Sequence, residues 1–242
     1  MIPKIVFSDF DGTLTLGESL TPVFFNIIDI LKKNNIDFIP VSGRSLSWGH
    51  FLLTHFDFQY AIMEGGGVMA YKCKLGFIRN HFLISKDARK KLERFSNGLL
   101  KKFPGLELTA DSLGRVTDRA IELDLLDSMG IKKDIENYME EKNINHSTSS
   151  VHLNFWCGEI SKMNAVNHYL MNETESIKIK DCLFFGDAGN DQSCFQGFDH
   201  SVGVSNISGV LDQLTHKPTI VLKGNDKKGP LGVYSFLSDA LK

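Results

Sequence analysis

The sequence has no paired cysteines, no long apolar run and no strong excess of one charge. Its four cysteines form no CxxC pair in 242 residues, which excludes a zinc ribbon or a disulfide framework and favours a reducing compartment. The 27 basic and 29 acidic residues give a formal net charge of −2, so we expect no nucleic-acid partner. No segment has the apolar length of a membrane span or of a signal-peptide core. We therefore expect no membrane partner and a cytoplasmic location.

Several common functional motifs are also missing. The eight histidines include no HExxH pair, so a zinc site is not expected. The run Gly65–Gly67 fits neither GxGxxG nor GK[ST] and indicates a hairpin turn rather than a nucleotide-binding loop. The sequence has no internal repeat, and it leaves the oligomeric state open. A hydrophobic content of 42% and a charged content of 23% are typical of a soluble globular protein.

The segment from Ile5 to Thr13 carries the strongest pattern in the chain. An apolar run, Ile5–Phe7, predicts a strand buried on both faces, and it is followed by Asp9, Asp11 and Gly12. Side chains two positions apart in an extended chain point to the same side, so the two carboxylates are expected to share one small space. Two such acids need a cation or a shared proton. The alternative is a strand followed by a solvated Asp-Gly turn.

The same pattern returns further along the chain. An amphipathic helix beginning at Pro22 leads to a second apolar run, Phe38–Val41, which ends in Ser42-Gly43-Arg44. Another apolar run, Cys182–Phe185, ends in Gly186-Asp187-Ala188-Gly189-Asn190-Asp191. Strands that alternate with helices predict an α/β fold with a doubly wound parallel-sheet (Rossmann-like) core.

Residues 81–157 interrupt that alternation. They contain a long amphipathic helix ended by Pro104-Gly105, strand-like segments near Leu106–Leu108 and Val116–Leu125, a second helix from Met129 to Lys142, and a final alternating strand, Val151–Trp156. We therefore predict an inserted α+β domain at 81–157, with the α/β core formed by 1–80 and 158–242.

The polar residues after the strands would meet at one edge of a parallel sheet. Four acids, a lysine, a hydroxyl and several backbone amides would gather there. Such a cluster of carboxylates favours Mg²⁺, and a metal opposite a lysine and backbone donors suits a phosphoryl group.

These residues resemble the four motifs of the haloacid dehalogenase superfamily: DFDGT, Ser42-Gly43-Arg44, Lys162 and GDAGND. The insert between the second and third motifs resembles the C2-type cap of the Cof-type, mannosyl-3-phosphoglycerate, trehalose-phosphate and sucrose-phosphate phosphatases. The resemblance implies a Mg²⁺-dependent phosphomonoester hydrolase that acts on a small phosphorylated metabolite, a sugar phosphate above all.

The resemblance also implies roles for individual residues. Asp9 would be the nucleophile that forms an aspartyl-phosphate, and Asp11 would be the general acid and base. The metal would be held by Asp9, the Asp11 carbonyl, Asp187 and Asp191. The implied substrate-binding residues are Gly12, Thr13, Ser42, Gly43, Arg44, Lys162 and Asn190.

Each of these residues also has a purely structural interpretation. Asp187 and Asp191 could be turn and cap residues, Ser42 could cap a helix, Lys162 could be a solvated first-turn residue, and Arg44 could be structural. At the level of function, the alternatives are a phosphotransferase or mutase on the same scaffold, or a non-catalytic phosphate-binding module.

Overall fold

The computed structural model of the protein describes residues 2–17, 19–148 and 152–242. Its central sheet has five strands in the order β11-β10-β9-β1-β2, and all of its strand pairs are parallel. The bounds of these strands are Ile5–Ser8 (β1), Asp37–Pro40 (β2), Cys182–Gly186 (β9), Ser201–Gly203 (β10) and Ile220–Val221 (β11). The predicted doubly wound α/β core is thereby confirmed.

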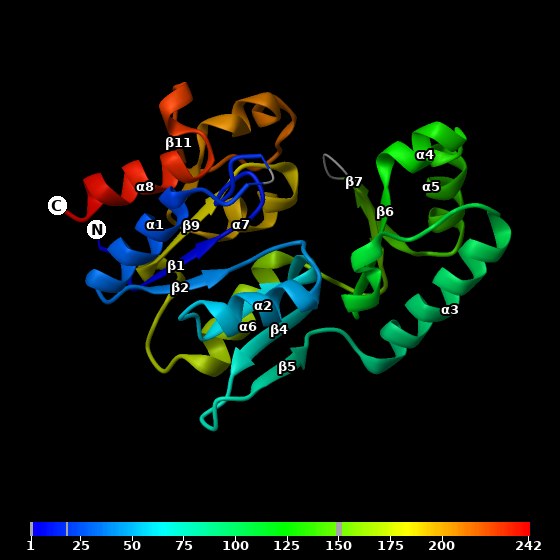
Figure 1. Ribbon diagram of the computed structural model, residues 1–242, viewed down its shortest axis with the longest axis horizontal. Helices are drawn as coiled ribbons and strands as arrows, with labels where there is room; N and C mark the ends of the chain where they lie inside the picture. Colours follow the sequence, from blue (N-terminus) through cyan, green and yellow to red (C-terminus); the bar gives the residue numbers. More distant parts are fainter. Residues whose placement is uncertain (1, 18, 149–151) are drawn as a thin grey trace.

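Helices cover both faces of this sheet (Figure 1). Neighbouring residues of β1 point to opposite sides, so Val6 belongs to one apolar core and Ile5 and Phe7 to the other. On the first side pack α1, α2 and α8, and on the second α6 and α7. These helices span Pro22–Lys33 (α1), Leu46–His55 (α2), Lys162–Glu173 (α6), Gln192–Gly197 (α7) and Gly229–Ala240 (α8). Burial on both faces explains why the first three residues of β1, Ile5–Phe7, are all apolar.

A second, antiparallel sheet continues the first. Its order is β3-β4-β5, with strands at Tyr60–Met63 (β3), Val68–Lys72 (β4) and Ile78–Phe82 (β5). A parallel bridge from Val41 to Ile62 connects it to the end of β2. Between β3 and β4 the chain makes a short 3₁₀ turn, η1 (Glu64–Gly66), where the sequence indicated a hairpin turn.

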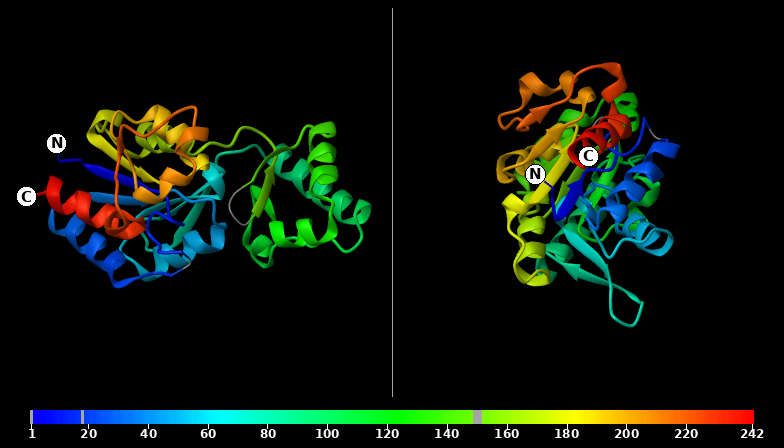
Figure 2. Two further views of the ribbon diagram at one scale, coloured as in Figure 1. Left: turned by 90° about the horizontal axis from the view of Figure 1, so that it is seen from above. Right: turned by 90° about the vertical axis from the view of Figure 1, so that its left-hand side faces the viewer.

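The inserted segment forms a third sheet with its own helices and its own apolar core. The sheet order is β6-β8-β7, with strands at Asp118–Glu122 (β6), Asn145–Thr148 (β7) and His152–Trp156 (β8). The helices are Lys86–Lys102 (α3), Leu123–Met129 (α4) and Lys132–Glu141 (α5). Figures 1 and 2 show that this sheet lies on the side of the insert nearer the parallel sheet, with the helices behind it.

Details of the insert differ from the sequence-based prediction. The strand expected over Val116–Leu125 ends at Glu122, and Leu123 begins α4. The helix expected from Met129 to Lys142 is interrupted at Gly130, which takes a positive φ of 66° and caps α4. The segment 106–108 is not a strand, and Val151 lies outside the described residues. The division at 80/81 and 157/158 stays a prediction.

Among the described residues, no helix has both the length and the apolar character that crossing a bilayer requires.

Candidate active site

Most of the residues predicted to meet lie together at the carboxyl end of the parallel sheet. β1 lies between β2 and β9, so the strand order runs to β2 on one side of β1 and through β9, β10 and β11 on the other. Ligands of doubly wound sheets bind at such a switch point. Asp9 follows β1 directly, and its backbone amide donates to the carbonyl of Phe185 at the end of β9, at 2.9 Å. Asp9 and Asp187 are thereby held on the two sides of the switch point.

Lys162 joins two of the acids. Its Nζ lies 2.5 Å from Asp9 Oδ1 and 2.7 Å from Asp191 Oδ1, and all three side chains are buried. The lysine is the first residue of α6, whose N-cap Ser161 accepts a hydrogen bond from the amide of Asn164. Lys162 is therefore not a solvated first-turn residue, because it is the buried counter-ion of the acids.

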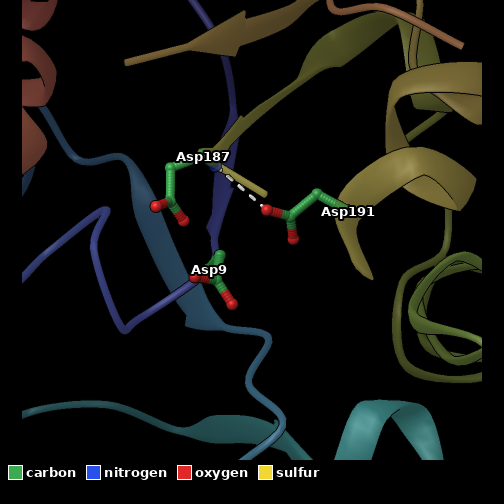
Figure 3. Close-up of side chains that lie close together, drawn as sticks. All are labelled: Asp9, Asp187 and Asp191. Atoms are coloured by element: carbon green, nitrogen blue, oxygen red, sulfur yellow. Dashed lines mark hydrogen bonds between the residues drawn. The ribbon is translucent and has the colours of Figure 1, made fainter. Parts of the chain in front are cut away.

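Asp187 completes the acid cluster from the other side (Figure 3). Its Oδ1 accepts from Thr13 Oγ1 at 3.2 Å and its Oδ2 from Asn206 Nδ2 at 2.7 Å. Gly12 takes a positive φ of 77°, and a Cβ at this position would collide with the Asp187 carboxylate. Glycine is thus required at position 12 by both backbone conformation and space.

Asp191 acts mainly through hydrogen bonds to its surroundings. While Oδ1 accepts from Lys162, Oδ2 accepts from the backbone amides of Asp187 and Ala188, at 3.0 and 3.1 Å. Its carboxylate therefore fixes the turn after β9 and the lysine at the same time. Because Asp191 holds the backbone amide of Asp187 and the ammonium group that binds Asp9, it also helps to orient these two acids.

Burial and mutual repulsion raise the proton affinity of the acids. Burial raises the pKa of Asp9 well above its usual value, although the charge of Lys162 opposes the change. Burial and the neighbouring Asp191 raise the pKa of Asp187 to about 7. Burial alone would lower the pKa of Lys162, but Asp191 and Asp9 outweigh it and raise that pKa. The site therefore carries more negative charge than one lysine offsets.

A hard cation would relieve this excess. Carboxylate oxygens of Asp9, Asp187 and Asp191 all lie within 4.8 Å of one another. An all-oxygen donor set is the type that Mg²⁺ and similar ions take. The residues at this point of the structure therefore fit a divalent cation.

The expectation that the carboxylates of Asp9 and Asp11 share one space is wrong: Asp9 is buried beside Lys162, whereas Asp11 lies apart from that cluster, on the exposed side of the site. Its carboxylate is paired with Arg44, whose Nε lies 2.9 and 2.8 Å from the two oxygens and whose Nη2 lies 2.6 Å from Oδ1. The guanidinium carbon of Arg44 also lies 4.2 Å from the centre of the Trp48 ring. Arg44 thus holds the side chain of Asp11 in one defined place.

The remaining predicted residues lie around the same site. Ser42 is buried, and its Oγ accepts from the amide of Arg44 at 3.1 Å. The carbonyl of Gly43 accepts from Arg115 at 3.0 Å. Asn190 is exposed and lies in the turn after β9. The structure thus brings these residues to the sheet edge, and whether they bind substrate stays a prediction.

Sequence reasoning missed three residues that support the site. Asn206 holds Asp187 and the carbonyl of Gly12, and it follows β10 just as the predicted acids follow β1 and β9. The strand-end rule, applied to one more strand, would have found it. Glu64 and Arg115 received no role from the sequence, but both are buried. Charged residues are usually exposed, and no pattern in the sequence predicted the burial of these two.

The fold and the site define an α/β protein with a carboxylate–lysine cluster at the switch point of its sheet. The model of the haloacid dehalogenase-like hydrolases matches residues 90–231. The chain belongs to that family.

Comparisons with solved structures agree on the fold over the whole chain. A protein of Thermoplasma acidophilum superposes with a TM-score of 0.71 at 19% identity, covering 99% of this chain and 98% of that one. The sucrose-phosphatase of Synechocystis, in complex with sucrose and phosphate, gives 0.70 at 14% identity, with 99% and 98% covered. A haloalkanoate-superfamily phosphatase of Bacteroides thetaiotaomicron gives 0.70 at 15% identity, with 98% and 95% covered. A comparison with curated proteins gave no match.

Proposed function

We propose that this protein is a Mg²⁺-dependent phosphatase that hydrolyses a small phosphorylated metabolite. The observation that carries the proposal is the convergence of Asp9, Asp187, Asp191 and Lys162 within hydrogen-bond or ligand distance at the carboxyl end of the sheet. Phosphoryl transfer requires carboxylates that can hold a cation and a positively charged side chain beside them. Membership of a hydrolase family supports the same conclusion.

Asp9 is the proposed nucleophile. One carboxylate oxygen of Asp9 attacks phosphorus, so that an O–P bond forms to Asp9 while the bond from phosphorus to the substrate alcohol breaks. Asp11 gives its proton to the departing alcohol oxygen. A water then attacks the aspartyl-phosphate, Asp11 takes the proton of that water, and inorganic phosphate and free Asp9 are released. The two steps balance without any further reactant.

The pairing of Asp11 with Arg44 fits a proton carrier whose carboxylate lies outside the acid cluster before substrate binds. Arg44 holds both carboxylate oxygens, so Asp11 must leave this ion pair before it can reach a leaving-group oxygen. An incoming phosphate ester offers Arg44 another anion to bind. In this mechanism Arg44 leaves Asp11 for the phosphate group when substrate binds, and the freed Asp11 takes up from solvent the proton that it then gives to the departing alcohol.

Asp9 and Asp187, oriented by Asp191, are the proposed Mg²⁺ ligands together with the Asp11 carbonyl. When bound, the ion neutralises charge on the phosphoryl oxygens and keeps Asp9 ionised beside its neighbours. Lys162 adds a second positive charge next to Asp9, and Ser42 with the amides after β1 offers donors to the phosphoryl oxygens. Asn190 and Thr13 complete the proposed substrate contacts.

A sugar phosphate is the proposed substrate class. In the insert, Glu122 pairs with His152 and Ala120 with Asn154, on the face of the sheet opposite Leu153 and Phe155. That face lies toward the parallel sheet (Figure 2), and its carboxylate, imidazole and amide groups are suited to hydroxyl groups. The bound sucrose and phosphate of the Synechocystis structure are consistent with this assignment. We further propose that residues 81–157 act as the cap of the site.

The test is hydrolysis of a panel of phosphorylated metabolites and a generic aryl phosphate, with Mg²⁺ or with a chelator. We expect phosphate release that requires Mg²⁺, with a sugar phosphate among the better substrates. Asp9→Asn removes the nucleophile and should lower the rate by at least about a thousandfold.

Asp37→Asn is the matched control, since Asp37 is an exposed acid at the start of the neighbouring β2; it should retain the wild-type rate. Hydrolysis that survives in Asp9→Asn would reject the proposal. Transfer of the phosphoryl group to added sugar acceptors, in place of release to water, would favour a transferase instead.

A further inference from the structure

The loop Ser42–Arg44 has all three of its backbone carbonyls bonded by residues from other parts of the chain. Gly65 donates its amide to Ser42 O, and Glu64 donates its amide to Arg44 O, both at 3.0 Å. The Gly43 carbonyl accepts from Arg115 Nη1, also at 3.0 Å. The first two bonds come from the turn between β3 and β4, and the third comes from the insert.

The side chain of Glu64 reaches the insert from the same turn. Only 1% of Glu64 is exposed. Its carboxylate accepts from the amide of Leu46 at the start of α2, at 2.9 Å. It also accepts from the amides of Val116 and Thr117, at 3.0 and 2.5 Å, and from Thr117 Oγ1 at 2.6 Å. Glu64 thus holds the loop through its own amide and the insert through its carboxylate.

The backbone of Glu64 takes an uncommon conformation to do so. Its φ is 53°, a left-handed value that non-glycine residues seldom adopt. A residue in such a conformation is held there by its surroundings. Here the surroundings are the hydrogen bonds just described, on the two sides of the turn.

Arg115 is fixed just as firmly, but by acids of the insert. Its guanidinium is paired with Asp111 at 3.0 Å and with Asp118 at 2.9 Å, and its side chain is 3% exposed. Asn154, from β8, donates to Asp118 at 3.3 Å. The position of Arg115, and hence of its bond to the Gly43 carbonyl, is therefore set by the insert.

The contact between the two parts is also tight. A Cβ on Gly67 would collide with the Thr117 hydroxyl group. The absence of a side chain at position 67 therefore lets the segment 115–118 lie directly on the turn that holds the loop.

We propose that Arg115 and Glu64 are positioning residues: they make the geometry of the Ser42–Arg44 loop depend on the position of the insert. Neither residue touches reacting atoms. Arg115 holds the central carbonyl of the loop from the insert, and Glu64 ties the flanking turn to the same segment. The loop therefore keeps its phosphate-binding geometry only while segment 115–118 lies against the turn between β3 and β4. This inference rests on the proposed function, in which Ser42 and Arg44 contact the phosphoryl group.

The test replaces Arg115 by Met and follows the loop without turnover. The protein has two tryptophans, so Trp156→Phe leaves Trp48, which stacks on Arg44, as the fluorescent reporter of the loop. In that background we expect Arg115→Met to shift the Trp48 emission and to raise the Kd for inorganic phosphate about tenfold, the effect of one lost hydrogen bond to a placed group. Arg115→Lys should recover part of both signals.

Arg94→Met is the matched control. Arg94 is an exposed arginine of α3 in the same insert, so its loss should leave the Trp48 signal and the phosphate affinity unchanged. A folded Arg115→Met protein with wild-type Trp48 emission and wild-type phosphate affinity would overturn the inference.

Thr117→Val covers the case in which Arg115→Met does not fold. It removes one hydroxyl bond to Glu64 and leaves the pairs of Arg115 intact. We expect a smaller change of the same sign, about threefold in phosphate Kd, and no change would overturn the coupling. If the wild-type protein binds no phosphate, the proposed function fails, and the Trp48 emission of the same variants still decides the coupling.

Discussion

Two buried cations in this molecule each lie between two aspartates, and they serve different purposes. In the core, Lys162 lies between Asp9 and Asp191, and in the insert Arg115 lies between Asp111 and Asp118. The difference is in the neighbours. A third acid, Asp187, joins the lysine cluster with its carboxylate beside the other two. The third acid near the arginine cluster, Glu64, instead has its carboxylate bound by backbone amides and the Thr117 hydroxyl, and a backbone carbonyl and an amide bind Arg115 and Asp118.

The surplus acid makes the core cluster fit a divalent cation. Burial and Asp191 raise the pKa of Asp187 to about 7, which records negative charge that the lysine does not offset. Arginine offers a planar fork that binds two carboxylates and a carbonyl at once, whereas lysine is a compact point charge. In the insert, arginine therefore binds two acids and the Gly43 carbonyl in fixed positions. In the core, lysine lies next to an acid cluster that can still accept a cation.

Removing the lysine should give the largest effect. Lys162→Met leaves buried carboxylates without their cation, so we expect a rate loss of at least about a hundredfold and a free energy of unfolding lower by about 3–5 kcal/mol without metal. Mg²⁺ should then raise the melting temperature of Lys162→Met more than that of the wild type, because the ion replaces the missing charge.

Two variants complete the measurement. Lys72→Met is the control, since Lys72 donates to the carbonyl of Phe56 and lies outside the acid cluster. Arg115→Met should lose stability without any recovery by Mg²⁺. Equal stabilisation of Lys162→Met and Arg115→Met by Mg²⁺, measured by thermal unfolding, would contradict the distinction between the two clusters.

The pH dependence of stability should reveal the acid of the insert cluster. Burial raises the pKa of Asp118 from 3.8 to about 6; Arg115 opposes the change and Glu64 adds to it. The folded protein binds this proton more tightly than the unfolded chain, so ionisation opposes folding and stability is lost as the pH rises from about 4 to about 6. The full effect is at most roughly 3 kcal/mol.

Asp118→Asn does not titrate, so thermal unfolding at a series of pH values isolates this effect. The stability of the wild type relative to Asp118→Asn should fall across that interval. Asp124→Asn, a change at an exposed acid of the same insert, should show no such trend. A constant difference between wild type and Asp118→Asn would mean that folding does not raise the pKa of Asp118.

The sequence was informative for the core because the apolar runs that become β1, β2 and β9 are each followed by polar residues. Strand-end acids such as Asp9 and Asp187 can be assigned to one sheet edge from the chain order alone, since parallel strands align their carboxyl ends. Lys162 was harder, because its partner acids are 153 and 29 residues away in the sequence. Its position came from the resemblance to a family.

The insert was less predictable for a physical reason. Alternation of apolar and polar residues over Ile121, Leu123 and Leu125 fits a strand, but the three residues divide between β6 and α4. Over so few residues, strand and helix periods overlap, and packing decides. The contact that Glu64 and Arg115 make between the insert and the Ser42–Arg44 loop could not be predicted either. Charged residues are usually exposed, and only their partners in space make their burial possible.

The smallest expected effect concerns Asn206, which orients Asp187 from behind. Its Nδ2 donates to Asp187 at 2.7 Å and to the Gly12 carbonyl at 3.0 Å, while its Oδ1 accepts from the amide of Gly229. Asn206→Ala should raise the Mg²⁺ concentration for half-maximal activity about tenfold, with little change in kcat at saturating Mg²⁺. Asn34→Ala, on the exposed end of α1, is the control.

Asn190→Ala sharpens the result, because a residue that contacts substrate changes KM at saturating Mg²⁺ and leaves the Mg²⁺ requirement as it was. If Asn206→Ala needs no more Mg²⁺ than the control, Asp187 does not depend on this amide for its orientation.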